Sequence, residues 1–256
     1  MILRSVTKHV KEQNWFAVVL DLAIVVVGVF IGIQVANLNE EQKEKLIASE
    51  YVERIQEDLS ANEKDLRNRI QYYQRLKNHA LGALSALSQP VETLEQQFLI
   101  DIYHASNSLP RQLGRDSYDE ILSIGALNTI TNINIRQRLA QYYRHIKTSE
   151  YFFLNIPEYR NKLRSLMPHE VQSDIRKTCG LTFYTDETGA PIIVFTEKCD
   201  LRLTQDQVSN AVAIVYSSDI KPYLTRVLAD FELKLNLFQV VINRSEQLRA
   251  YLRETN

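Results

Sequence analysis

The residues that could carry metal or acid–base chemistry are five histidines, two cysteines and 31 acidic side chains in a chain of 256 residues. The histidines are His9, His79, His104, His145 and His169. No two of them form a His-Glu-x-x-His motif or another metal-ligand spacing. We therefore expect each to be a surface or capping residue, and we predict no metal site.

The acidic side chains include two close pairs, Asp116 with Asp119 and Glu57 with Asp58. In a chain with 31 acidic residues such pairs arise by chance, and a helix cap explains Asp116. Neither pair therefore indicates acid–base catalysis. Sequences typical of a nucleophile elbow, a phosphate-binding loop or a dinucleotide site are absent. The sequence predicts no catalytic residue, no cofactor and no enzymatic activity, although distant residues can still converge in the fold.

The two cysteines, Cys179 and Cys199, flank a segment that departs from the helical composition of the chain. LTFYT and PIIVFT are rich in β-branched and aromatic residues and enclose a turn sequence at 186–189. This pattern predicts a two-stranded hairpin at 179–199 whose ends meet. A disulfide is favoured over a metal site, which would need further ligands, and closing a loop of roughly 20 residues contributes about 3 kcal/mol.

The element that positions everything else is an apolar run at residues 15–36, interrupted only by Asp21 and Gln34. At about 1.5 Å per residue it can cross a hydrocarbon core of roughly 30 Å. A signal peptide is the rival interpretation, but the one candidate cleavage site has the bulky Gln34 where a small residue is expected. We predict a retained transmembrane helix.

The flanks of this run predict its orientation. Residues 1–14 carry Arg4, Lys8 and Lys11 against one acidic residue, whereas the other flank has mixed charge. By the positive-inside rule, residues 1–14 are a cytoplasmic tail and residues 37–256 form a domain outside the cytoplasm.

The outer domain reads as mainly α-helical. No Pro or Gly interrupts the chain between residue 37 and Gly82, so the membrane helix is expected to continue as one rod to about Ser88. Its charged faces, which include Glu63, Asp65 and Arg69, are expected to be solvated. Apolar residues at three-four spacing form the seam of a coiled coil or an elongated bundle. The seam consists of Ala48, Val52, Ile55, Leu59, Asn62, Leu66, Ile70, Tyr73, Leu76, Ala80, Leu84 and Leu87.

A second long helix, from Ser217–Asp219 to Asn256, is the expected antiparallel partner of the rod. Shorter helices are predicted at 93–105, 116–124, 134–153 and 155–166, with Gly125 as a left-handed C-cap. The 13 tyrosines are expected to pack mainly in the core, with a Tyr-lined ligand pocket as the alternative.

One face of the predicted span combines a carboxyl group with two small residues. At about 100° per residue, Asp21, Val25, Gly28 and Gly32 share a narrow sector. This face predicts close contact with a second copy of the span or with another membrane protein. The alternative is that Asp21 is hydrated near the interface and the glycines face lipid.

Several stretches together resemble a family of uncharacterised bacterial single-pass inner-membrane proteins, known as a domain of unknown function. They are LDLAIVVVGVFIGIQVANLNE, YVERIQEDL and SYDEILSIGALNTITNINIRQRLAQYY. The resemblance covers the first two-thirds of the chain. It implies an inner-membrane anchor with a mostly helical periplasmic domain, and no catalytic residues.

These observations favour a membrane-anchored periplasmic interaction or scaffolding protein. A net charge of -1 gives no reason to expect a nucleic-acid partner, so the expected partners are the lipid bilayer and another membrane helix. The first alternative is a ligand-sensing periplasmic module that signals through a membrane partner. The second is a periplasmic enzyme of unrecognised type.

Overall fold

The computed structural model describes residues 15–185, 191–196 and 199–255. The predicted cytoplasmic tail and the turn at 186–189 lie outside the described residues. The fold is mainly α-helical with one small antiparallel hairpin, as the sequence predicts. The elements are α2 (Trp15–Ala86), η1 (Val91–Thr93), α3 (Gln96–His104), α4 (Asp116–Ser123), η2 (Ala126–Thr129), α5 (Ile133–Leu154), α6 (Glu158–Leu166), α7 (His169–Thr178), β1 (Leu181–Thr185), β2 (Pro191–Phe195), α8 (Gln205–Tyr216) and α9 (Lys221–Thr255).

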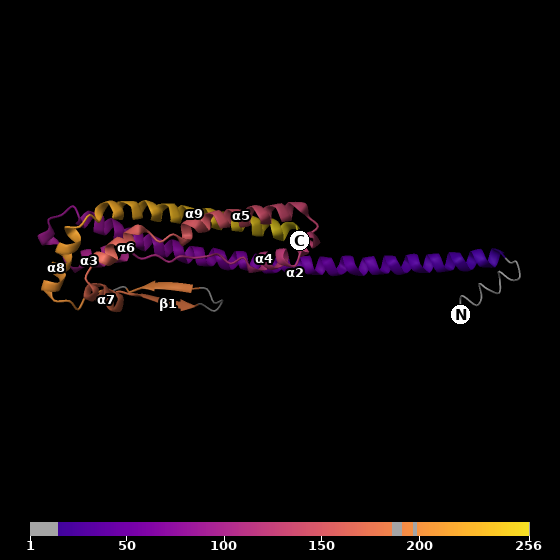
Figure 1. The fold of residues 1–256 in the computed structure, drawn as a ribbon, viewed down its shortest axis with the longest axis horizontal. Helices are drawn as coiled ribbons and strands as arrows, with labels where there is room; N and C mark the ends of the chain where they lie inside the picture. Colours follow the sequence, from indigo (N-terminus) through magenta and orange to yellow (C-terminus); the bar gives the residue numbers. More distant parts are fainter. Residues whose placement is uncertain (1–14, 186–190, 197–198, 256) are drawn as a thin grey trace.

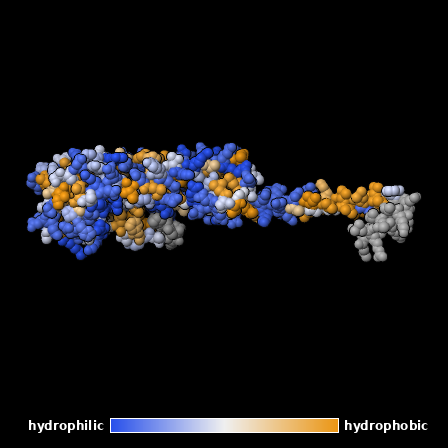
Figure 2. Space-filling model, viewed as in Figure 1, coloured by the Kyte–Doolittle hydropathy of each residue, from blue (hydrophilic) through white to orange (hydrophobic). Residues whose placement is uncertain are grey.

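Helix α2 is a single rod of 72 residues that joins the apolar run to the bundle (Figure 1). Its first part projects alone, with large apolar side chains from Trp15 to Val35 exposed. Figure 2 shows these apolar residues along the thin rod, separated from the bundle by a hydrophilic stretch. By length and composition this helix can cross a membrane. Ile47 and Ala48 are partly buried against the core, and full burial begins at Tyr51.

Helix α9 is the antiparallel partner of α2, as predicted. Three ion pairs between the two helices show that they run in opposite directions. They join Lys77 to Glu232 (2.7 Å), Arg67 to Glu246 (2.5 Å) and Glu63 to Arg249 (2.7 Å). Residues earlier in α2 thus pair with residues later in α9. The end of α9 therefore lies where α2 leaves the bundle toward the apolar run (Figure 1). Helices α3, α6, α7 and α8 gather at the opposite end.

Two helices were missed at the sequence level, α7 and α8. Helix α7 is short and buries only Val171 and Ile175, so its apolar pattern is weak. Helix α8 carried a recognisable signal, because Thr204 and Gln207 form a capping box at its start. Gly125, by contrast, takes the predicted left-handed conformation, with φ of 70°.

Asp116 is not the cap of α4, contrary to expectation. Arg115 occupies the N-cap position and makes no side-chain capping bond. Instead, the Ser117 N–H donates to Oδ2 of Asp58 in α2, over 3.0 Å. The cap is supplied by another helix, which sequence proximity could not indicate.

The prediction that Glu63, Asp65 and Arg69 are solvated is wrong, since all three are buried. Asp65 and Arg69 belong to a run at three-four spacing that holds the irregular segment 106–117 against the rod. We call this run the polar stripe. It consists of Asp58, Asn62, Asp65, Arg69 and Tyr73.

Asn62 makes two hydrogen bonds to the backbone of one residue, Gly114. Its Oδ1 accepts the Gly114 N–H over 2.8 Å, and its Nδ2 donates to the Gly114 carbonyl over 2.7 Å. The segment has no regular partner for its backbone, so these bonds satisfy groups that burial would leave unpaired. The polar stripe runs beside the predicted apolar seam, shares Asn62 and Tyr73 with it, and binds backbone groups of the segment.

Asp65 and Arg69 continue the stripe toward the far end. Asp65 Oδ2 accepts from Nε of Arg69 and from Nε of Arg111, each over 3.0 Å. Arg69 then donates to the Leu109 carbonyl over 2.7 Å, and the Tyr73 hydroxyl accepts the Leu109 N–H over 3.2 Å. The charges of the buried pair are thus hydrogen-bonded as well as paired.

Replacing Asn62 with Leu tests the polar stripe. The substitution keeps the side-chain size but leaves the Gly114 N–H and carbonyl without their partner, at an expected cost of about 2 kcal/mol in the free energy of unfolding. Urea unfolding of the full chain in uncharged detergent, followed by circular dichroism, measures it. Glu57→Gln, an exposed change one turn earlier in α2, is the control and should stay within about 0.5 kcal/mol. Equal effects of the two changes would contradict the role assigned to Asn62.

Candidate functional site

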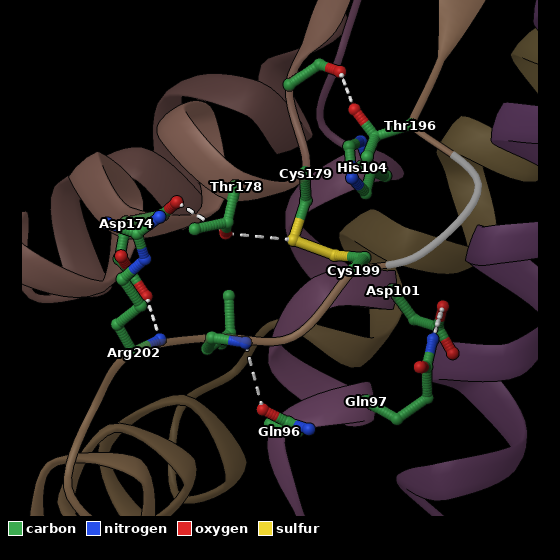
Figure 3. The surroundings of a disulfide bond; sticks show 12 residues. Gln96, Gln97, Asp101, His104, Asp174, Thr178, Cys179, Thr196, Cys199 and Arg202 are labelled. Atoms are coloured by element: carbon green, nitrogen blue, oxygen red, sulfur yellow. Dashed lines mark hydrogen bonds between the residues drawn. A yellow bond between two sulfur atoms is a disulfide. The ribbon is translucent and has the colours of Figure 1, made fainter.

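The predicted hairpin is present, and the two cysteines that flank it are joined. Strands β1 and β2 pair antiparallel, with Leu181 opposite Phe195. Cys179 and Cys199 form a disulfide with their Cα atoms 4.9 Å apart (Figure 3). The covalent link connects the end of α7 to the segment that leads into α8.

Hydrogen bonds fasten the chain on both sides of the disulfide (Figure 3). The Arg202 N–H donates to Asp174 Oδ2 over 2.6 Å, and the Leu201 N–H donates to Gln96 Oε1 over 3.2 Å. The Thr196 hydroxyl donates to the Gly180 carbonyl over 2.9 Å. Helices α3 and α7 are therefore tied to the same short stretch of chain.

The hairpin docks on the bundle through Phe195. This side chain is buried, and its ring centre lies 5.6 Å from that of Tyr72, 6.0 Å from that of His104 and 6.3 Å from that of His79. The guanidinium of Arg75 lies over the same ring at 5.1 Å. The hairpin thus contributes Phe195 to the core, with Leu181 and Ile193 packed against it.

His104 is buried, with 3% of its surface exposed, so the expectation that every histidine is a surface or capping residue is wrong here. Its ring stacks on that of His79 at 4.8 Å, and His79 Nδ1 lies 2.8 Å from Asp101 Oδ1. Burial, with the neighbouring His79 and Arg164, lowers the pKa of His104 to about 4. The ring is therefore neutral at neutral pH.

A cationic pocket opens beside this cluster. It has a volume of about 350 Å³ and lies where α3, α6, α7 and β1 meet. We call it the arginine pocket; it is lined by Tyr103, His104, Asn107, Arg160, Arg164, Arg176, Gly180, Leu181 and Phe183. Three guanidinium groups thus share one hollow, and no carboxylate is among its described lining residues.

Arg164 is the most constrained of the three cations. Its guanidinium lies 3.5 Å from the centre of the Tyr103 ring, its Nε donates to the Ser106 hydroxyl over 2.7 Å and one Nη donates to Asn107 Oδ1 over 2.9 Å. Burial, with Arg160 and Arg176 adding to it, lowers the pKa of Arg164 from its ordinary value. Neutral groups therefore orient this cation without neutralising it.

The predicted interaction face of the span is exposed along the described rod. Asp21 is half-buried, while Val25, Gly28 and Gly32 are exposed. A side chain placed at either glycine would meet nothing within 4 Å. No described residue therefore covers this face at Gly28 and Gly32.

Sequence reasoning missed the arginine pocket and found the disulfide. Arg160 and Arg164 are one turn apart in a helix that was predicted, but Arg176 lies in α7, which was not. A pair of cations at that spacing is common on solvated helices, so the sequence offered no distinctive signal. Most of the tyrosines are buried in the core as expected, and Tyr103 alone lines this pocket.

Comparison with protein-family models, with curated proteins and with solved structures finds no match to this chain. The residues and their geometry alone therefore support the proposals that follow.

The neutral, buried His104 predicts a loss of stability in mild acid. Its pKa is lowered in the folded state from 6.5 to about 4, so the unfolded chain takes up the proton first as the pH falls. The contribution of the neutral His104 to the free energy of unfolding is complete above about pH 6.5 and is lost toward about pH 4. The loss between pH 7 and pH 5 amounts to about 1–2 kcal/mol.

Thermal unfolding of the full chain in uncharged detergent at these two pH values measures the loss. His104→Gln should reduce the difference between the two pH values, whereas His169→Gln, at an exposed position, should leave it unchanged. A difference that persists in full in His104→Gln would assign the acid sensitivity to other groups.

Proposed function

We propose that this protein is a membrane-anchored interaction or scaffolding protein that holds a rigid helical bundle at a fixed distance from the bilayer. The observation that carries the proposal is the continuity of α2, from Trp15 in the apolar run to Ala86 at the far end of the bundle. One helix is thus both the anchor and the central element of the outer domain. Any rotation or displacement of the span is transmitted directly to the core.

The segment between span and bundle supports a spacer role. Residues 37–46 are helical and exposed, and at about 1.5 Å per residue they extend about 15 Å. Lys45 and Glu41 pair across one turn over 2.6 Å. A helical stalk of this kind holds the bundle at one distance from the bilayer, whereas a flexible linker would only set the largest distance that the bundle can reach.

The side of the span with Val25, Gly28 and Gly32 is the proposed contact between copies. Small residues allow the backbones of two membrane helices to approach closely, and Asp21 on the same side would avoid the lipid. In this proposal the domain lies outside the cytoplasm at the inner membrane of a bacterium. Self-association through the span would present two bundles side by side.

Cysteine crosslinking in native membranes tests the contact. Val25→Cys places a thiol on the proposed face, while Val26→Cys, about 100° further round the helix, is the matched control. Oxidation should give crosslinked dimers with Val25→Cys and few with Val26→Cys. Adding Gly28→Ile and Gly32→Ile should abolish the crosslink, because bulky residues separate the backbones, and Asp21→Leu should weaken it without blocking insertion. Equal crosslinking at both positions, or indifference to the glycine changes, would remove the proposed dimer.

Membrane-impermeant maleimide tests the orientation. Cys179 and Cys199 are bonded to each other, so an added cysteine is the reactive one. Ser49→Cys, at an exposed position where α2 enters the bundle, should be labelled in intact spheroplasts, because this part of α2 is proposed to lie outside the cytoplasm. Ser5→Cys should be labelled only after lysis. The reverse pattern would invert the orientation.

A further inference from the structure

We propose that the arginine pocket binds a small organic anion, a molecule that joins one phosphate or carboxylate group to an apolar or aromatic body. This goes beyond the scaffolding function and does not depend on it. The pocket volume of about 350 Å³ lies at the small end of the range of ligand sites.

The first argument is the charge of the pocket. Arg160, Arg164 and Arg176 converge, and the described lining contains no carboxylate to balance them. Arg176 has no ion pair or hydrogen bond among the described contacts. Bringing like charges together in a partly desolvated site costs free energy, which an anion in the pocket would recover.

The second argument is that two of the three cations, Arg160 and Arg164, are oriented before any ligand arrives. Ser106 accepts from Arg164 through its hydroxyl and from Arg160 through its carbonyl, the latter over 3.1 Å. Arg164 is also stacked on Tyr103. A guanidinium has five N–H donors, so donors remain for the oxygens of a phosphate or carboxylate. Preorganised donors of this kind reduce the entropy lost on binding.

The third argument is the apolar side of the pocket. Leu181 and Phe183 of β1 line it together with the cations, and 55% of Phe183 is exposed. Gly180 completes the wall, and a side chain there would lie 2.2 Å from the Arg176 carbonyl, so the close approach of β1 to α7 requires glycine. An apolar body could therefore cover Phe183 while its anionic group reaches the arginines.

The position of the pocket excludes the anchoring bilayer as the source of the anion. His104 in the pocket stacks on His79 of α2, which is 43 residues beyond the end of the predicted span at Ala36. At about 1.5 Å per residue, the distance along the rod is about 65 Å. The headgroups of the membrane that holds the span cannot reach it, so the ligand is a soluble molecule.

Calorimetric titration of the full chain in uncharged detergent tests the proposal with three probes. Phenyl phosphate carries both the anionic group and an aromatic body, whereas inorganic phosphate and phenol each carry one of them. We expect phenyl phosphate to bind with a dissociation constant below about 1 mM and at least about tenfold more tightly than either of the others. Absence of binding, or equal binding of phenyl phosphate and inorganic phosphate, would overturn the proposal.

Two variants and one control locate the binding. Arg176→Gln changes an exposed side chain, so the fold is retained, and it should weaken phenyl phosphate binding about tenfold. Phe183→Ser should weaken phenyl phosphate but not inorganic phosphate. Arg226→Gln removes an equal charge from an exposed arginine outside the pocket and should have no effect. An equal loss in Arg226→Gln, or no loss in Arg176→Gln, would show that binding occurs elsewhere.

Discussion

The structure depends on how the backbone of the irregular, partly buried segment between α3 and α4 is satisfied. Residues 106–117 run alongside α2 with little regular structure, and their N–H and carbonyl groups need partners that no helix or sheet provides. The polar stripe supplies those partners from one face of α2. Because the stripe has helical spacing, the segment is held in register along the rod, and this fixes where α3 and α4 must lie.

The same helix also binds α9 on an adjacent face. Glu63, one residue after Asn62, accepts from the Ser245 hydroxyl and from Arg249 of α9, each over 2.7 Å. The middle of α2 is therefore the place where the segment 106–117 and the C-terminal helix are both fixed. Breaking one member of such buried pairs is costly, since the remaining charge has no water to replace its partner.

The far end of the bundle is organised by different means. There the Cys179–Cys199 disulfide, the docking of Phe195 and the bonds from Asp174 and Gln96 join α7, the hairpin and the segment before α8 to the bundle. Helix α7 buries only Val171 and Ile175, so its position depends on these ties. The arginine pocket is a product of that assembly, as its lining comes from four separate elements.

The sequence by itself determined the features that depend on neighbouring residues. The apolar run, the long uninterrupted rod, the C-terminal helix, the hairpin and the cysteine pair each follow from local composition or a short repeat. Tertiary structure decided which polar residues are buried and which groups they contact. Charge alone could not indicate that Asp65 and Arg69 are buried, that Asp58 caps α4, or that Arg176 lines the same pocket as Arg164, because each depends on how separate elements pack. A polar side chain gains its role from what packs against it, and only the fold specifies that.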